Sequence, residues 1–285
     1  MTTQRPTMWL QLAGQDEINI ESICSGLRFL KDTSTPAVTN NYQDNTGSDG
    51  SIHNYTAYAK TTVQANFWLH FSDWYDFKLK CHEIYRVFNN RSQMRIRTDA
   101  EPATVKYVYP GVFDIAPLED ESHDALFTIP FDNPSGYKYS LANSDELITY
   151  DTGVWQLYGQ NIPNGQDTGY SFSNQTTLNV YNASDIAIDP YRQLHELLIE
   201  MSVNSSNSGF KLSNPLNGTS WRYTGSLTSS DALEINGLNT FKNGNLDNNN
   251  TDFGYLKLEK GWNTIQVQGA NDLSITFSFP FIYID

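Results

Sequence analysis

Two His-Glu pairs in the sequence resemble the start of a zinc-binding protease helix. His82-Glu83 and His195-Glu196 both lack the second histidine that this motif needs three residues after the glutamate, where the chain has Arg86 and Ile199. The histidines also lack the short mutual spacing that zinc sites use. They are His53, His70, His82, His123 and His195. We therefore expect no catalytic metal.

The signatures of three other large enzyme classes are absent from the sequence. It has no Gly-x-Ser-x-Gly nucleophile elbow, no Gly-x-x-x-x-Gly-Lys-Ser/Thr phosphate loop and no Gly-x-Gly-x-x-Gly dinucleotide fingerprint. The run Glu119-Asp120-Glu121 could supply the two carboxyl groups of a glycosidase, but adjacent acids in a polar break are typical of a solvated turn. We predict that the chain is not an enzyme and carries no cofactor.

Two oxygen-rich segments have the composition of calcium loops, and two cysteines complete the candidate ligands. The segments cover residues 44–50 and 247–252, and neither ends with the bidentate glutamate of an EF-hand. Cys24 and Cys81 are too few for a disulfide framework or a cysteine-based zinc site. We expect no metal site, and we interpret both cysteines as reduced core residues.

Aromatic side chains are the remaining candidates, because exposed Trp and Tyr rings anchor protein interfaces and stack on sugars. Trp221 and Tyr223 follow a turn-rich segment, and Trp262 follows a glycine. Core packing, a protein interface and sugar stacking all stay open for these three rings. Core packing is favoured for Trp221 and Tyr223, because alternate residues of a strand share a face.

Composition limits the class of protein that these side chains belong to. The 285 residues include 18 basic and 32 acidic residues, a net charge of −14, so the chain has no general source of phosphate neutralisation. This argues against sequence-specific binding of nucleic acid. Apolar residues make up 39% and aromatic residues 13%, which indicates a folded, β-rich protein. No run of about 20 apolar residues is present and no signal-type apolar core follows the first residues, so we expect neither membrane insertion nor export.

The first half of the chain reads as strand, helix, then strands. Residues 61–71 alternate apolar and polar side chains, which predicts a long half-buried strand. Apolar residues then recur every three or four positions over residues 73–89, behind the N-cap pair Ser72-Asp73, which predicts one amphipathic helix. Alternation returns in residues 93–98, 104–115 and 125–131. The Thr-, Asn- and Ser-rich residues 32–54 predict an exposed, mobile loop.

The second half contains short alternating runs at the spacing of a β-sandwich. The predicted strands cover residues 154–158, 176–181, 197–203, 210–212, 220–223, 232–235, 255–258, 264–268 and 274–283. Turn formers without periodicity over residues 134–145 indicate a linker. We therefore predict an N-terminal domain, 1–140, and a C-terminal domain, 141–285.

The order of these pieces resembles the distal tail proteins of siphophages that infect Gram-positive bacteria. The first half of the chain looks like the N-terminal domain of that family. It has, in order, a Gly-rich segment at residues 47–50, a long strand, the helix at residues 75–88 and a strand at residues 93–97 leading into Glu101-Pro102. Residues 210–223, 258–263 and 277–283 are similar to the galectin-like domain of the same family. The His-x-Asn-Pro-Arg signature of sugar-binding galectins is missing around Asn214-Pro215.

The resemblance implies a mainly β protein with an N-terminal β-sandwich-like domain, one helix and a C-terminal galectin-like sandwich. It also implies a structural hub at the distal end of the phage tail, made in the bacterial cytoplasm and assembled as a homohexameric ring that lets DNA pass. The implied partners are the tail tube protein, the tail-tip or tail-associated lysin protein and the receptor-binding protein. The alternative function is a cell-surface carbohydrate-binding β-sandwich protein.

Overall fold

The chain folds into two compact units. The computed structural model describes residues 5–47, 49–146, 148–149, 153–156, 158–163, 166, 168–204, 208–270 and 272–284. The N-terminal unit runs up to Lys138 and includes Ile284, and the C-terminal unit is Tyr139–Tyr283. Antiparallel strands dominate both units, which confirms the predicted mainly β fold. No helix in the described ranges is long and apolar enough to cross a membrane.

The N-terminal unit is built on one antiparallel sheet. Its strands, in spatial order, are β2 (Ile18–Asn19), β1 (Met8–Leu12), β7 (Met94–Thr98), β8 (Thr104–Pro110), β9 (Asp124–Asn133), β6 (Thr61–His70) and β3 (Leu27–Thr33). Strand β6 pairs with β9 along its full length and buries every second side chain, including Phe67 and Leu69. The alternation predicted for residues 61–71 is therefore confirmed.

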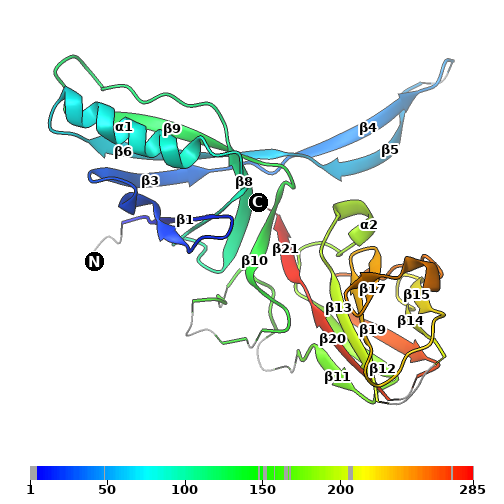
Figure 1. Ribbon diagram of the computed structural model, residues 1–285. Helices are drawn as coiled ribbons and strands as arrows, with labels where there is room; N and C mark the ends of the chain where they lie inside the picture. Colours follow the sequence, from blue (N-terminus) through cyan, green and yellow to red (C-terminus); the bar gives the residue numbers. More distant parts are fainter. Residues whose placement is uncertain are drawn as a thin grey trace. The chain divides into compact units, whose positions relative to one another are not determined.

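Helix α1 (Trp74–Phe88) lies along the face of this sheet formed by β3, β6 and β9 (Figure 1). Asp73 caps its N-terminus by accepting a hydrogen bond from the Asp76 backbone N–H at 2.8 Å. The helix buries one stripe of side chains, as its spacing predicts. The stripe comprises Phe77, Lys80, Cys81, Ile84 and Phe88.

Trp74 does not belong to that stripe, although its spacing predicts that it does. Its side chain is 57% exposed. As the first residue of α1 it packs its ring on Phe77, at 5.4 Å between centroids, and the Lys78 ammonium lies 4.6 Å from the ring centroid. The prediction that Trp74 is buried was wrong, because the aromatic contact lies at the solvent edge of the helix.

The region predicted as a loop at residues 32–54 contains most of a β-hairpin. Strands β4 (Val38–Asp44) and β5 (Ser51–Tyr58) pair only with each other, and all their residues are exposed. Gly47 and Gly50 adopt positive φ angles of 85° and 80° in the connecting turn. The hairpin projects away from the sheet that α1 covers (Figure 1). The predicted exposure of this region is confirmed, but the prediction of a loop was wrong, because a hairpin exposed on both faces has no polar and apolar alternation to reveal it.

The C-terminal unit is a sandwich of two antiparallel sheets. One sheet has the order β11 (Ser171–Ser173), β20 (Leu273–Ser278), β13 (Leu198–Val203), β16 (Ala232–Asn236), β17 (Asn239–Lys242) and β18 (Asn245–Leu246). The other has the order β12 (Thr177–Asn182), β19 (Gly261–Gln268), β14 (Phe210–Asn214) and β15 (Thr219–Tyr223). The Trp221 indole N–H of β15 donates to the Thr240 hydroxyl of β17 at 3.0 Å, which ties the two sheets together.

Four predicted segments differ from the observed elements. The predicted linker at residues 134–145 contains strand β10 (Tyr137–Asn143), which pairs with β21 (Pro280–Ile284). The single strand predicted at residues 274–283 is divided into β20 and β21. A strand was predicted at residues 154–158, but the described residues of this segment form none, and residue 157 lies outside the described ranges. The strand predicted at residues 255–258 is reduced to isolated β-bridges. A short helix, α2 (Pro190–Gln193), completes the unit.

Candidate functional site

The hairpin of β4 and β5 exposes large apolar side chains to solvent. Tyr42 is 58% exposed, and Ile52 and Tyr55 are each 54% exposed. Polar side chains link the two strands: Asn54 donates to Asn41 at 2.8 Å. An isolated two-stranded hairpin is marginally stable in water, and exposed apolar side chains of this kind are typical of an interaction surface.

The sequence analysis missed these hairpin residues. A signal for them exists, because the Asn-Thr-Gly-Ser-Asp-Gly run at residues 45–50 is preceded by a segment with Val, Thr and Tyr and followed by one with Ile, Tyr and Thr, as in a hairpin. Asp44, at the start of the oxygen-rich segment at residues 44–50, accepts a hydrogen bond from the Ser51 hydroxyl across the hairpin at 2.5 Å. This carboxylate therefore helps to close the turn.

Two of the three predicted aromatic candidates lie in the core of the sandwich. Trp221 and Tyr223 are each 1% exposed, and their rings stack at 6.2 Å between centroids. The Tyr223 hydroxyl donates to Asp247 at 2.6 Å. The two side chains share one buried face of β15, which agrees with the core interpretation. Since their rings are covered by the fold, neither side chain is available to stack on a sugar or to contact a partner.

Trp262, the third candidate, has an exposed ring. It lies on the outer face of β19 with 42% of its surface accessible. It borders an open groove of about 480 Å³, which we call the Trp262 groove. The lining residues are Gly169, Ser171, Phe172, Gln175, Asn179 and Trp262. Sequence reasoning missed Phe172, Gln175 and Asn179, because only the pairing of β11 and β12 with their neighbours brings these side chains to Trp262.

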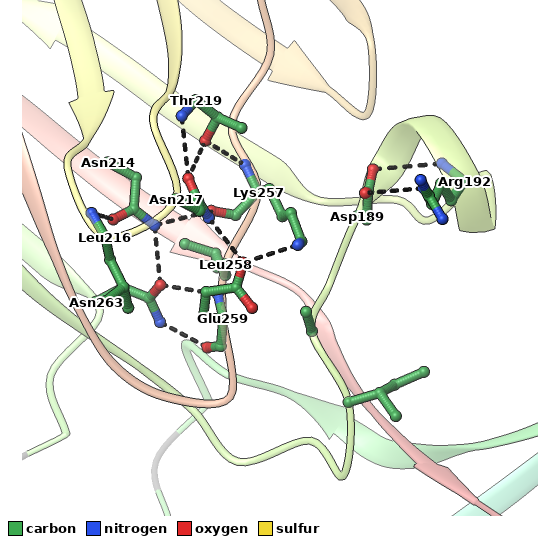
Figure 2. Close-up of polar contacts among 12 residues, drawn as sticks. Asp189, Arg192, Asn214, Leu216, Asn217, Thr219, Lys257, Leu258, Glu259 and Asn263 are labelled. Carbon is green, nitrogen blue, oxygen red and sulfur yellow. Dashed lines mark hydrogen bonds and ion pairs between the residues drawn. The ribbon is translucent and has the colours of Figure 1, made fainter. Parts of the chain in front are cut away.

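The Asn214-Pro215 turn, the part of the chain compared with the galectin signature, forms a buried polar network (Figure 2). The Asn214 amide N–H group donates to the Lys257 carbonyl and to Asn263 Oδ1, both at 2.9 Å, and Asn214 Oδ1 accepts from the Leu216 N–H at 3.2 Å. Asn263 in turn accepts from the Glu259 N–H at 2.8 Å. Because these amides are fully buried and paired within the fold, the turn is structural.

Asn217 and Asp189 extend the same structural pattern (Figure 2). Asn217 donates to the Lys257 carbonyl at 2.9 Å and accepts from the Thr219 hydroxyl at 2.7 Å. Asp189 caps helix α2 by accepting from the backbone N–H of Arg192 at 3.3 Å. These side chains fix loops between strands, so we assign them no ligand.

The second oxygen-rich segment, at residues 247–252, uses its first carboxylate within the fold. Asp247 accepts from the Tyr223 hydroxyl on one oxygen and from Asn250 at 2.7 Å on the other. Among the described residues, no group of three or more His, Cys, Asp or Glu side chains is arranged to share a metal ion.

The remaining candidates for chemistry are structural. Cys24 and Cys81 are free and buried, which confirms their predicted role in the core. Burial raises the pKa of the Cys24 thiol to about 11, so it stays protonated and unreactive at neutral pH. The acids Glu119, Asp120 and Glu121 lie on an exposed turn, as predicted.

Comparisons with known proteins agree with the sequence resemblance. Residues 14–133 match the family model described as the phage tail protein RIFT-related domain. No curated protein matches the sequence. SPP1 Dit (gp 19.1), described as a paradigm of the hub adsorption apparatus in phages that infect Gram-positive bacteria, has a TM-score of 0.69 at 8% identity. The alignment covers 96% of this chain and 99% of that chain. A chain of the phage p2 baseplate in its activated conformation with Sr has a TM-score of 0.47 at 11% identity, covering 96% and 98%.

Residues 14–133 of the N-terminal unit therefore match a phage tail domain, and the whole chain has a fold similar to that of SPP1 Dit. The resemblance found in the sequence is confirmed at this level.

Proposed function

We propose that this chain is the structural hub at the distal end of a siphophage tail. It closes into a ring of six copies through the N-terminal unit and joins the tail tube to the tail-tip and receptor-binding proteins. The ring leaves an opening through which DNA passes. The tail domain over residues 14–133 and the shared fold support this role, and catalysis has no part in it.

The observation that carries the proposal is the exposed hairpin of β4 and β5. A closed ring with one kind of contact needs two different complementary surfaces on each copy. The hairpin supplies one of them, because its two strands reach beyond the sheet (Figure 1) with unpaired outer edges and exposed side chains. A second copy of the chain is the occupant we assign to this surface.

The net charge supports passage of DNA through such a ring. A protein with a net charge of −14 offers little nonspecific attraction to a polyanion, so DNA slides without being retained. The alternative function, a cell-surface carbohydrate-binding protein, predicts a different assembly state, because such a protein is expected to be a monomer or a dimer.

Light scattering on purified full-length protein tests the hairpin contact. We expect the wild type to have six times the 32.3 kDa mass of one chain. The double variant Tyr42→Ser, Tyr55→Ser removes two exposed rings from the hairpin, so we expect smaller species at the same concentration. Tyr158→Ser is the matched control, because Tyr158 is 81% exposed on the C-terminal unit. Wild-type mass in the hairpin double variant would rule out this arm as the assembly contact.

A further inference from the structure

The Trp262 groove combines aromatic and polar side chains from both sheets of the C-terminal unit. Phe172 comes from β11, Asn179 from β12 and Trp262 from β19, and Gln175 lies in the link between β11 and β12. The groove volume of about 480 Å³ lies within the range of small-molecule sites. Such a convergence of side chains distinguishes it from an isolated exposed ring.

Neighbouring aromatic side chains hold both rings of the groove in place. Tyr181 contacts the Trp262 ring edge-on, with centroids 5.0 Å apart and ring planes at 62°. The Tyr181 hydroxyl is itself fixed, because it donates to the Asn161 carbonyl at 3.0 Å. Phe172 meets Phe277 of strand β20 at 6.2 Å and 82°. A flat apolar surface is therefore preorganised for a ligand, which reduces the entropic cost of binding.

Uncharged polar groups complete the groove. Asn179 Oδ1 accepts from the Thr264 hydroxyl at 3.2 Å, which orients the amide, and its NH₂ group has no protein partner among the described residues. Gln175 is exposed and its side chain makes no hydrogen bond within the described part of the chain. The Ser171 hydroxyl lies 3.1 Å from that of Thr276. These groups offer both donors and acceptors to a ligand.

The charge around the groove narrows the class of ligand. None of the six lining residues is charged, and the chain as a whole is acidic. A phosphate or carboxylate ligand would find no counter-charge and would meet repulsion from the acidic surface. A neutral molecule with one apolar face and several hydroxyl groups fits the rings and the amides together.

We propose that the Trp262 groove binds a neutral saccharide. One sugar ring stacks its C–H face on Trp262, and its hydroxyl groups exchange hydrogen bonds with Asn179 and Gln175. The site uses neither the Asn214-Pro215 turn nor the hairpin. The proposal therefore goes beyond the hub role and does not depend on ring assembly.

Binding of defined sugars to the full-length protein tests this proposal. The probes are maltotriose, cellotriose, chitotriose and lactose, followed by tryptophan fluorescence and by saturation-transfer NMR. We expect saturable binding to at least one probe, with a dissociation constant about tenfold higher in Trp262→Ala. Asn179→Ala should weaken binding about threefold or more, since it removes a single hydrogen-bonding group. Trp74→Ala is the matched control, because it removes another exposed indole from the N-terminal unit.

Two results would overturn the proposal. The first is the absence of saturable binding to all four sugars by the folded wild-type protein. The second is unchanged affinity in both Trp262→Ala and Asn179→Ala. Circular dichroism establishes that each variant is folded; if Trp262→Ala is not, Asn179→Ala and Gln175→Ala decide the test, because both side chains are exposed. Failure of the sugar test leaves the mass of the assembly unchanged, so it is distinguishable from failure of the hub proposal.

Discussion

Buried polar side chains fix the loops of the C-terminal unit. Among them, His195 has a pKa that burial shifts strongly, so it makes the stability of the fold depend on pH. It is 6% exposed, and its Nε2 donates to the Pro280 carbonyl at 3.0 Å. Its Nδ1 has no partner among the described residues. Burial lowers the pKa of His195 from 6.5 to about 4, against the opposing effect of the bond to Pro280. The folded protein therefore holds a neutral imidazole where the unfolded chain is protonated.

This difference predicts a loss of stability in mild acid. Between pH 6.5 and pH 4 the unfolded chain binds a proton at His195 that the folded chain does not, so the free energy of unfolding falls as the pH falls. At about 1.4 kcal/mol per pKa unit, the contribution lost over this window reaches about 3 kcal/mol. Urea unfolding at pH 7, 6, 5 and 4 measures it.

The comparison variants for this experiment are His195→Gln and His53→Gln. His195→Gln removes the titrating group, so we expect a shallower pH dependence than in the wild type. His53 lies on the exposed hairpin, and His53→Gln should retain the wild-type slope. Parallel pH profiles for wild type and His195→Gln would show that His195 is not the source of the acid sensitivity.

At the residue scale, sequence patterns locate faces of strands better than they locate binding sites. The Trp221-Arg222-Tyr223 alternation correctly predicts one buried face, because both rings follow the period of the strand. The same rule places Trp262 outside, since Asn263, Ile265 and Val267 point inward on β19. The groove around Trp262 was beyond prediction, because its other residues are brought together only by sheet topology.

At the scale of elements, helix α1 is the part of the fold with the strongest sequence signal, and it carries a sharp stability prediction. Phe77 is 2% exposed and packs on Phe71 with centroids 4.7 Å apart. Phe77→Ala should therefore lower the free energy of unfolding by about 3–5 kcal/mol through the cavity it leaves. Trp74 lies in the same helix but is 57% exposed, so Trp74→Ala should lower the free energy of unfolding by less than about 1 kcal/mol.

Chemical denaturation of the two variants measures the difference directly. A loss below about 0.5 kcal/mol in Phe77→Ala would mean that this face of α1 is not packed on the sheet. Equal losses in the two variants would contradict the assignment of Trp74 to the solvent edge.

Elements without a one-sided hydrophobic pattern were not predictable by alternation. The helix and strand β6 each bury one face, so their periods stand out in the sequence. The hairpin of β4 and β5 buries neither face, and its Asn- and Thr-rich strands read as a loop. Strand β10 was predicted as a linker, because the turn-forming residues Pro134, Ser135 and Gly136 come directly before it.

At the scale of the whole molecule, the structural division after Lys138 lies close to the predicted domain boundary at residue 140. The assignment of separate N-terminal (1–140) and galectin-like (141–285) domains with distinct roles stays a prediction. The order of elements was enough to find the resemblance to distal tail proteins, because that order survives where only 8% of residues are identical to SPP1 Dit. Ring closure was not predictable from periodicity, since it depends on complementarity between two surfaces of neighbouring copies.

Electron microscopy of the purified full-length protein tests the central claim most directly. If the chain is a tail hub, class averages should show closed rings with sixfold symmetry and a central opening. These rings should persist when the protein is diluted to the concentrations used for grids. Single 32.3 kDa particles or open chains without a closed ring, at concentrations up to tens of micromolar, would contradict the hub proposal.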